Sequence, residues 1–230
     1  MTSSLTATLT ATLMLFGDAI GKTLRRTDGA RFDTATLRWL PDTLPAGATS
    51  LAGLLAPPLT PVQALHWLRH QCATPIRPPV GVIGPREATP EQLALAREVG
   101  RALAELGLTV LCGGRQGVME ATCLGVAEAG GISVGLLPDE DWTAANPHVT
   151  IPLATGIGVA RNALIARASL CLTAVGGGLG TLSEIALALQ FRKPVFTFPG
   201  SPDVPGGVTV RDVDELRERV CAAVLGLGNS

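Results

Sequence analysis

The sequence predicts an α/β fold, a doubly wound parallel sheet with helices on both faces, preceded by a small N-terminal β-rich appendage. From residue 80 onward, short apolar runs alternate with Leu- and Ala-rich segments of helical length. Repeated strand–helix units of this kind form a buried parallel sheet. Residues 5–13 differ, because Thr alternates strictly with Leu or Ala, which predicts a half-buried strand. We therefore expect two regions, residues 1–75 and residues 76–230.

Composition limits the classes of function. The chain has 230 residues, of which 47% are hydrophobic and 16% charged, enough for one large α/β domain. The net charge of −1 argues against nucleic acid or a membrane surface as a partner. The five cysteines are scattered, without a CxxC pair or metal-site spacing, and this predicts free buried thiols in a cytoplasmic protein without a metal. Residues 5–16 lack the features of a targeting or membrane segment.

The N-terminal region is expected to be a small β-meander followed by a linker helix. Residues 23–26 and 30–40 flank Thr27-Asp28-Gly29, a hairpin signal. Residues 41–61 are rich in Pro, Gly and Ala and read as a connector.

Thr60-Pro61 then provides an N-cap and a first-turn proline for a helix that runs to about Cys72. His66 and His70 lie four residues apart on this helix, on one face. Because no third ligand is apparent and the glutamate of the zinc protease motif is missing, we interpret them as surface histidines.

The second region reads as alternating strands and helices bounded by Gly, Pro and capping residues. Its predicted strands are residues 80–83, 108–112, 132–137, 149–152, 170–175 and 194–198. Its predicted helices are residues 90–106, 118–129, 158–168, 181–190 and 212–225, with loops at 138–147 and 199–207.

Two glycine-rich turns follow predicted strands, at residues 113–117 and 176–180. Glycines allow positive φ and close approach of a ligand to the backbone, and the amides at a helix start carry partial positive charge. Both turns therefore predict an anion site, typically for phosphate, in one cleft at the carboxyl ends of the strands. As an alternative, Thr181 and Glu184 fit a capping box, which would make Glu184 structural.

Neither turn matches the dinucleotide-binding fingerprint, which places GxGxxG after the first strand of the sheet. Here the first strand of the second region ends in Gly84-Pro85-Arg86. A nicotinamide-dependent dehydrogenase is therefore a poor fit.

Residues 113–121, GGRQGVMEA, and residues 177–184, GGLGTLSE, resemble the paired motifs of the LOG-like ("Lonely Guy") proteins. The resemblance covers roughly residues 80–198. It implies a Rossmann-like fold, a homodimer and, for the enzymes of the family, release of a free base from a nucleoside 5′-monophosphate.

The resemblance also implies the residues of the site. The catalytic pair would be Arg161 and Glu184, in which the carboxylate stabilises positive charge developing on the ribose. The residues expected to bind the phosphorylated ligand are Gly84, Gly113, Gly114, Arg115, Gly117, Met119, Asn162, Gly176, Gly177, Gly178, Gly180 and Thr181.

Three positions depart from the LOG pattern. Gly176 replaces the motif proline, Asn162 replaces a second basic residue, and Leu170 replaces an acidic one. A bacterial side branch that resembles molybdenum-cofactor carrier proteins is more similar, and the residues that carry this resemblance are Asn146-Pro147, Gly158, Arg161-Asn162 and residues 175–178.

Two hypotheses follow. The protein is a phosphoribohydrolase, or it is a carrier or sensor of a nucleotide or molybdopterin-type cofactor. Either way we expect a phosphorylated small molecule as partner and no required cofactor. A DNA-binding relative is disfavoured, because no basic stripe is visible.

Overall fold

The computed structural model describes residues 15–18, 23–26, 30–41, 58–72 and 76–227. The chain divides into two compact units, one formed by Met1–Pro75 with Val224–Ser230 and the other by Ile76–Ala223. The sequence pattern had assigned residues 224–230 to the second region. Residues 224–227 group with the first unit because the Leu225 side chain is fully buried in its core and Leu225 O accepts a 2.6 Å hydrogen bond from Trp39 Nε1.

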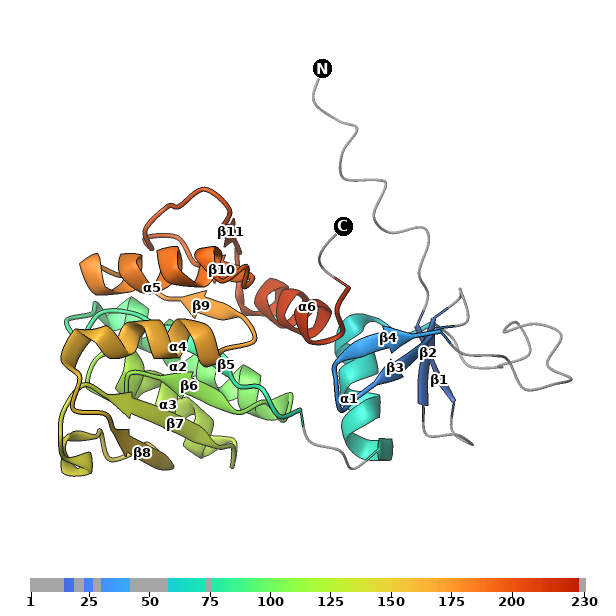
Figure 1. The fold of residues 1–230 in the computed structure, drawn as a ribbon, viewed down its shortest axis with the longest axis horizontal. Helices are drawn as coiled ribbons and strands as arrows, with labels where there is room; N and C mark the ends of the chain where they lie inside the picture. Colours follow the sequence, from blue (N-terminus) through green and yellow to red (C-terminus); the bar gives the residue numbers. More distant parts are fainter. Residues whose placement is uncertain (1–14, 19–22, 27–29, 42–57, 73–75, 228–230) are drawn as a thin grey trace, which may run out of the picture. The chain divides into compact units, whose positions relative to one another are not determined.

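The described residues of the first unit form a four-stranded antiparallel meander and one helix (Figure 1). Its elements are β1 (Leu15–Asp18), β2 (Thr23–Arg26), β3 (Arg31–Asp33), β4 (Arg38–Leu40) and α1 (Pro61–Cys72). The strand expected at residues 5–13 and the turn expected at 27–29 lie outside the described residues. Residues 30–40 form two strands rather than one arm, because Asp33 turns the chain by accepting hydrogen bonds from Ala35 N and Thr36 Oγ1. His66 is exposed, as expected.

The second unit is built on a seven-stranded parallel sheet in the order β11-β10-β9-β5-β6-β7-β8. The strands are β5 (Val80–Ile83), β6 (Val110–Cys112), β7 (Ser133–Leu137), β8 (Ile151–Ala154), β9 (Leu172–Ala174), β10 (Val195–Thr197) and β11 (Val208–Thr209). The chain builds the sheet outward from β5 to β8 and then returns to the other side of β5. The strand order therefore reverses between β5 and β9, and the carboxyl ends of these strands mark the expected ligand position.

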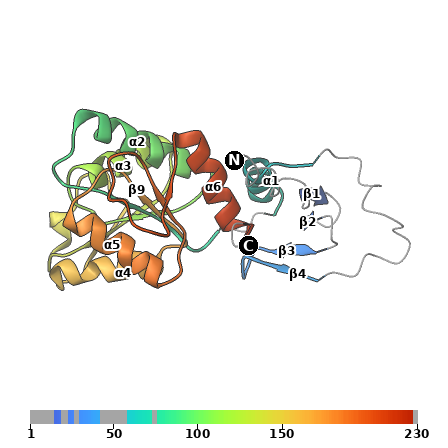
Figure 2. The same ribbon diagram turned by 90° about the horizontal axis from the view of Figure 1, so that it is seen from above.

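Helices cover both faces of this sheet, which confirms the expected fold class (Figure 2). The helices are α2 (Pro90–Glu105), α3 (Val118–Glu128), α4 (Asn162–Ala168), α5 (Leu179–Gln190) and α6 (Val213–Val224), with short 3-10 turns η2 (Trp142–Ala144) and η3 (Gly158–Arg161). Helices α2 and α3 lie on one face, while α4 and α5 lie on the other. The core between α4, α5 and the sheet includes Ile83, Ile165, Leu172, Ile185 and Val195.

The backbones of helices α2 and α3 are in close contact. A β-carbon at Gly100 would overlap Thr122 O, and one at Gly125 would overlap Arg97 O. The two glycines therefore set the spacing of this helix pair.

Several element boundaries differ from the sequence prediction. Strand β8 begins at Ile151 instead of Val149, because the Val149 side chain packs over Gly135. Strand β11 was not predicted, since two exposed residues carry no periodic pattern. Helix α5 begins at Leu179, two residues before the predicted start.

Within the described part of the second unit, four cysteines are free and buried, namely Cys112, Cys123, Cys171 and Cys221. Among the described residues no cluster of three or more His, Cys, Asp or Glu side chains could hold a metal ion. In the same part of the chain, none of the helices has the length and apolar character needed to span a bilayer.

Candidate functional site

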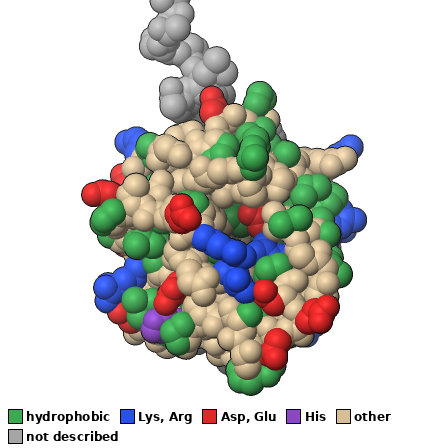
Figure 3. All heavy atoms as spheres, turned by 90° about the vertical axis from the view of Figure 1, so that its left-hand side faces the viewer, with side chains coloured by type: hydrophobic (Ala, Val, Ile, Leu, Met, Phe, Trp, Pro, Cys, Tyr) green, Lys and Arg blue, Asp and Glu red, His purple; other side chains and the backbone are tan. Residues whose placement is uncertain are grey.

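The carboxyl edge of the seven-stranded sheet carries the glycine turns and a basic hollow. Figure 3 faces this edge and shows Lys and Arg side chains gathered in a central depression. The turns that follow β5, β6 and β8 contribute Arg86, Arg115 and Arg161 to this edge. A basic hollow at a topological switch point is suited to an anionic ligand.

The turn between β9 and α5 contains glycines of two kinds. Gly176 and Gly177 have φ of 62° and 148°, and a β-carbon on either would overlap Gln92 or contact Thr181, so this chain's own backbone and packing require them. Gly178 and Gly180 differ, because a β-carbon there would meet nothing within 4 Å and neither residue has positive φ. No contact within the described chain explains glycine at these two positions.

Helix α5 starts without a side-chain cap. Its N-cap is Gly178, no side chain accepts a hydrogen bond from its first turn, and that turn contains no acidic residue. The capping box considered for Thr181 and Glu184 is therefore wrong, because both residues lie inside the helix. The amides of the first turn, with the positive end of the helix dipole, remain available to an anion.

Glu184 instead pairs with Arg161 across 23 residues of sequence. Arg161 Nη1 donates a 3.2 Å hydrogen bond to Glu184 Oε1, and the two residues are 8% and 6% exposed. Burial raises the pKa of Glu184 to about 7, while the charge of Arg161 opposes the rise. Burial lowers the pKa of Arg161, and the nearby positive charge of Arg86 lowers it further. The pair is thus desolvated and lies beside a second positive charge.

Arg161 is fixed by close packing and by a short polar chain. A β-carbon at Gly113 would overlap Arg161 Nη2, so the guanidinium occupies the space that glycine leaves. Arg161 Nη1 also donates to Asn162 Oδ1 at 2.6 Å, and Asn162 Nδ2 donates to Ser183 Oγ at 3.2 Å. Arg161 Nε is buried and has no partner among the described residues. This buried donor is left for a ligand or a water.

The turn after β6 is held by residues that sequence reasoning did not assign to the site. Buried Asn146 donates through Nδ2 to Gly114 O at 3.2 Å and to Arg115 O at 3.0 Å. Arg115 Nη1 forms a 2.5 Å ion pair with Asp139 Oδ2. Both partners come from the polar loop at residues 138–147, in which Asn146-Pro147 is part of the resemblance to the carrier-like branch and Asp139 has no motif.

The remaining expected site residues serve packing. A β-carbon at Gly84 would lie 2.5 Å from Val118 Cγ1 and from Val175 O, and one at Gly117 would overlap Arg86 O. Met119 is 6% exposed and belongs to a buried cluster with Cys112 and Cys123. The structure thus brings four residues together at the carboxyl edge, beside the turn at residues 176–181. They are Gly113, Arg161, Asn162 and Glu184.

Sequence comparison identifies one family and one curated relative. The SLOG cluster4 family model matches residues 77–219. An uncharacterized protein of Archaeoglobus fulgidus is 39% identical over 142 residues, which cover 62% of this chain and 93% of that protein.

Two solved structures resemble the second unit closely. The molybdenum cofactor binding protein of Rippkaea orientalis matches with a TM-score of 0.61 and 34% identity, over 65% of this chain and 99% of that one. The Moco carrier protein of Chlamydomonas reinhardtii matches with a TM-score of 0.60 and 37% identity, again over 65% of this chain and 99% of that one.

Proposed function

The chain belongs to the SLOG cluster4 family, and on this premise we propose that it binds and carries a phosphate-bearing small molecule of the molybdopterin or nucleotide type. The phosphate binds at the backbone amides of residues 177–181. The rest of the ligand lies along the carboxyl edge, toward the turn that carries Arg115.

One observation carries this proposal, namely the uncapped start of α5 beside Arg161. Gly178 and Gly180 leave open space in front of the first-turn amides, and the chain itself has no need of glycine there. The buried Nε of Arg161 lacks a partner among the described residues. A phosphate would satisfy these donors, since helix N-termini and arginines are the usual phosphate ligands.

The charges at this edge support a ligand with more than one negative charge. Arg115 is paired with Asp139 and Arg161 with Glu184, whereas Arg86 adds a positive charge that Arg161 senses. A phosphate group, which approaches two negative charges near neutral pH, would offset the excess. The two solved relatives, which are a cofactor binding protein and a carrier, support the same class of ligand.

Retention of the ligand tests the proposal. The protein is mixed with molybdenum cofactor freshly released from a molybdoenzyme, and the pterin is measured after gel filtration. We expect pterin to co-elute with the protein and to be displaced by excess inorganic phosphate. Elution of all pterin at small-molecule volume would contradict the carrier function.

A second candidate function is hydrolysis of the N-glycosidic bond of a nucleoside 5′-monophosphate. The approach of Arg161 to Glu184 supports it, because the resemblance assigns catalysis to this pair. Glu184 would stabilise positive charge on the ribose while Arg161 binds a ribose hydroxyl or the phosphate. Chromatographic screening of nucleoside monophosphates for base release tests this candidate. Base release that falls on the order of 100-fold in Glu184→Gln would favour the hydrolase function. Absence of base release by the native protein would favour the carrier function.

We also propose a homodimer in a reducing, cytoplasmic setting. Exposed apolar side chains on η3, α4 and α5 support self-association, and the four free buried thiols support the setting.

A further inference from the structure

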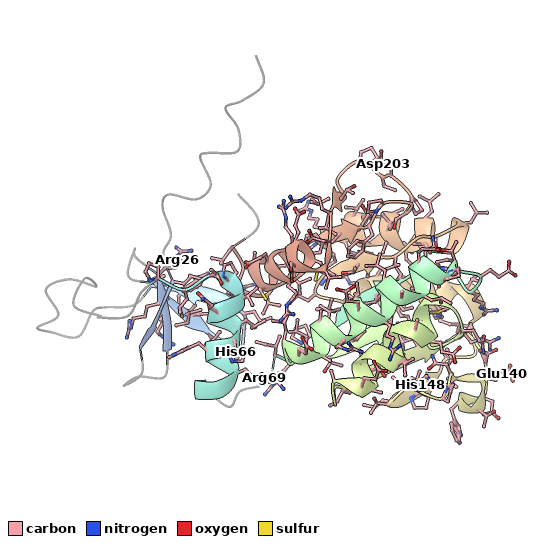
Figure 4. All side chains as sticks on the ribbon, turned by 180° about the vertical axis from the view of Figure 1, so that it is seen from behind. Arg26, His66, Arg69, Glu140, His148 and Asp203 are labelled. Carbon is pink, nitrogen blue, oxygen red and sulfur yellow. The ribbon has the colours of Figure 1, made fainter. Side chains whose placement is uncertain are left out.

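We propose a second ligand site, a groove between α2 and α3 that binds a small organic monoanion with an apolar body and a hydrogen-bond donor. The groove has a volume of about 490 Å³, within the range of small-molecule sites. It lies on the face covered by α2 and α3, whereas α5 lies on the opposite face (Figure 2), and Arg86 at the carboxyl edge lines one end of the groove. Figure 4 faces this side of the second unit and shows His148 beside α3.

The floor of the groove is apolar because of where the two helices carry small residues. Leu93 and Ala94 on α2 face Ala121 and Leu124 on α3. The helices are in backbone contact at Gly100 and Gly125, as described above, so they cannot close further to fill the space. The short alanine side chains leave a slot between two leucines, and an apolar body would bury this surface.

Polar groups at the rim define the charge of the ligand. Arg97 also lines the groove, but both its Nε and its Nη2 are held by the carboxylate of Glu128. Among the described residues, by contrast, the side chains of Arg86, Glu120 and His148 form no hydrogen bond or ion pair. The groove thus presents one unpaired cation, one unpaired carboxylate and one imidazole.

The charge of Arg86 places the negative group of the ligand at this end of the groove. Arg86 lies near enough to Arg161 to lower its pKa through charge repulsion, so this end has an excess of positive charge. The start of α3 does not add to this attraction, because Pro85 O accepts a hydrogen bond from Val118 N and Glu120 lies in the first turn of the helix. Glu120, which also lines the groove, can accept a hydrogen bond from an N–H or O–H group of the ligand.

The probe 8-anilinonaphthalene-1-sulfonate matches this chemistry, because it combines a sulfonate, two aromatic groups and one N–H donor. Its fluorescence is titrated against the full-length protein in the presence and absence of excess inorganic phosphate. We expect saturable binding of one probe per chain that phosphate does not displace. Displacement by phosphate would place the probe at the proposed phosphate site and overturn the second site.

Variants distinguish the groove from general apolar surface. Ala94→Trp and Ala121→Trp fill the slot from either helix, and Ala94 is exposed, so its replacement leaves the fold intact. Each should weaken probe binding by about tenfold or more. Arg86→Gln removes the cation and should weaken binding by about tenfold. Arg211→Gln, an exposed arginine that precedes α6, is the matched control and should change nothing.

Two further results would also overturn the proposal. Unchanged probe affinity in both tryptophan variants, with unchanged melting temperatures, would show that the probe binds elsewhere. Light scattering tests whether a second copy of the chain occupies the groove instead of a small molecule. Conversion of a dimer to a monomer by Ala94→Trp would show that it does. Neither result bears on phosphate binding at residues 177–181, which is measured separately.

Discussion

The guanidinium of Arg161 lies directly against the α-carbon of Gly113, in space that any side chain at that position would occupy. The glycine of the β6 turn thus serves an arginine that comes from a different part of the chain. Because Arg161 in turn holds Glu184, a single methyl group at Gly113 would disturb the buried pair.

Gly113→Ala should lower the free energy of unfolding by about 1–3 kcal/mol, the cost of overpacking a filled site. It should also weaken phosphate binding, since Arg161 has to move. Urea denaturation and phosphate titration measure the two effects. Gly178→Ala is the control for stability, because its β-carbon would meet nothing and the change should cost less than about 1 kcal/mol. Equal stabilities of the two variants would contradict the packing described here.

Arg161→Gln should destabilise the protein by about 3 kcal/mol at pH 8, because it leaves the ionised carboxylate of Glu184 buried without a cation. The loss should shrink at pH 5.5, where Glu184 can take up a proton. The matched control is Arg217→Gln, which breaks a more exposed ion pair with Glu105 and should cost at most about 1 kcal/mol. Similar losses in the two variants would show that burial of the Arg161–Glu184 pair has no energetic consequence.

The raised pKa of Glu184 predicts a pH-dependent stability. The native pKa is about 7 against an ordinary value of 4.5, so the folded state binds more protons between these values. The contribution of Glu184 to stability is therefore full below about pH 4.5 and is lost as pH rises to about 7. Melting temperatures of the native protein and Glu184→Gln should show their difference changing only in this window.

Glu128→Gln is the control for that measurement. Hydrogen bonds from Arg97 lower the pKa of Glu128 to about 2. The difference in melting temperature between the native protein and Glu128→Gln should therefore stay constant between pH 4.5 and 7. A flat difference for Glu184→Gln across the window would show that its pKa is not raised.

The proposed homodimer predicts a particle of twice the chain mass of 23.7 kDa in light scattering. The apolar segments at residues 121–127 and 185–189 do not supply the interface, because most of their large side chains pack against the sheet of this chain. Leu164, Leu179 and Leu182 on α4 and α5 are exposed instead. Leu164→Glu should therefore yield monomers, whereas Ile132→Glu, an exposed control before β7, should not. A native monomer at micromolar concentration would contradict the dimer.

Strand–helix alternation and glycine turns were sufficient to predict the parallel sheet of the second unit. The errors have local causes. Strand β11 has two exposed residues and no period, while β8 starts late because Val149 packs inward rather than pairing. Residues 30–40 split at Asp33, whose side chain stabilises a turn that strand propensity does not reveal.

The candidate site was predictable only where a motif marked it. Arg161 and Glu184 were reached through family resemblance, and their hydrogen bond depends on η3 and α5 meeting in space. Asn146 and Asp139 were not assigned to the site, because only the fold brings them near their partners, Gly114 and Arg115. Glycine, conversely, is ambiguous in sequence, since Gly84 and Gly117 serve packing while Gly178 faces open space.

Phosphate binding to the native protein and Gly178→Val is the most direct test of the account. Calorimetric titration should show one phosphate per chain for the native protein and at least about tenfold weaker binding for the variant, because the valine side chain would fill the approach to the α5 amides. Ala127→Val, an exposed position late in α3, should bind phosphate like the native protein. Undiminished binding by a folded Gly178→Val would contradict the proposed phosphate site at residues 177–181.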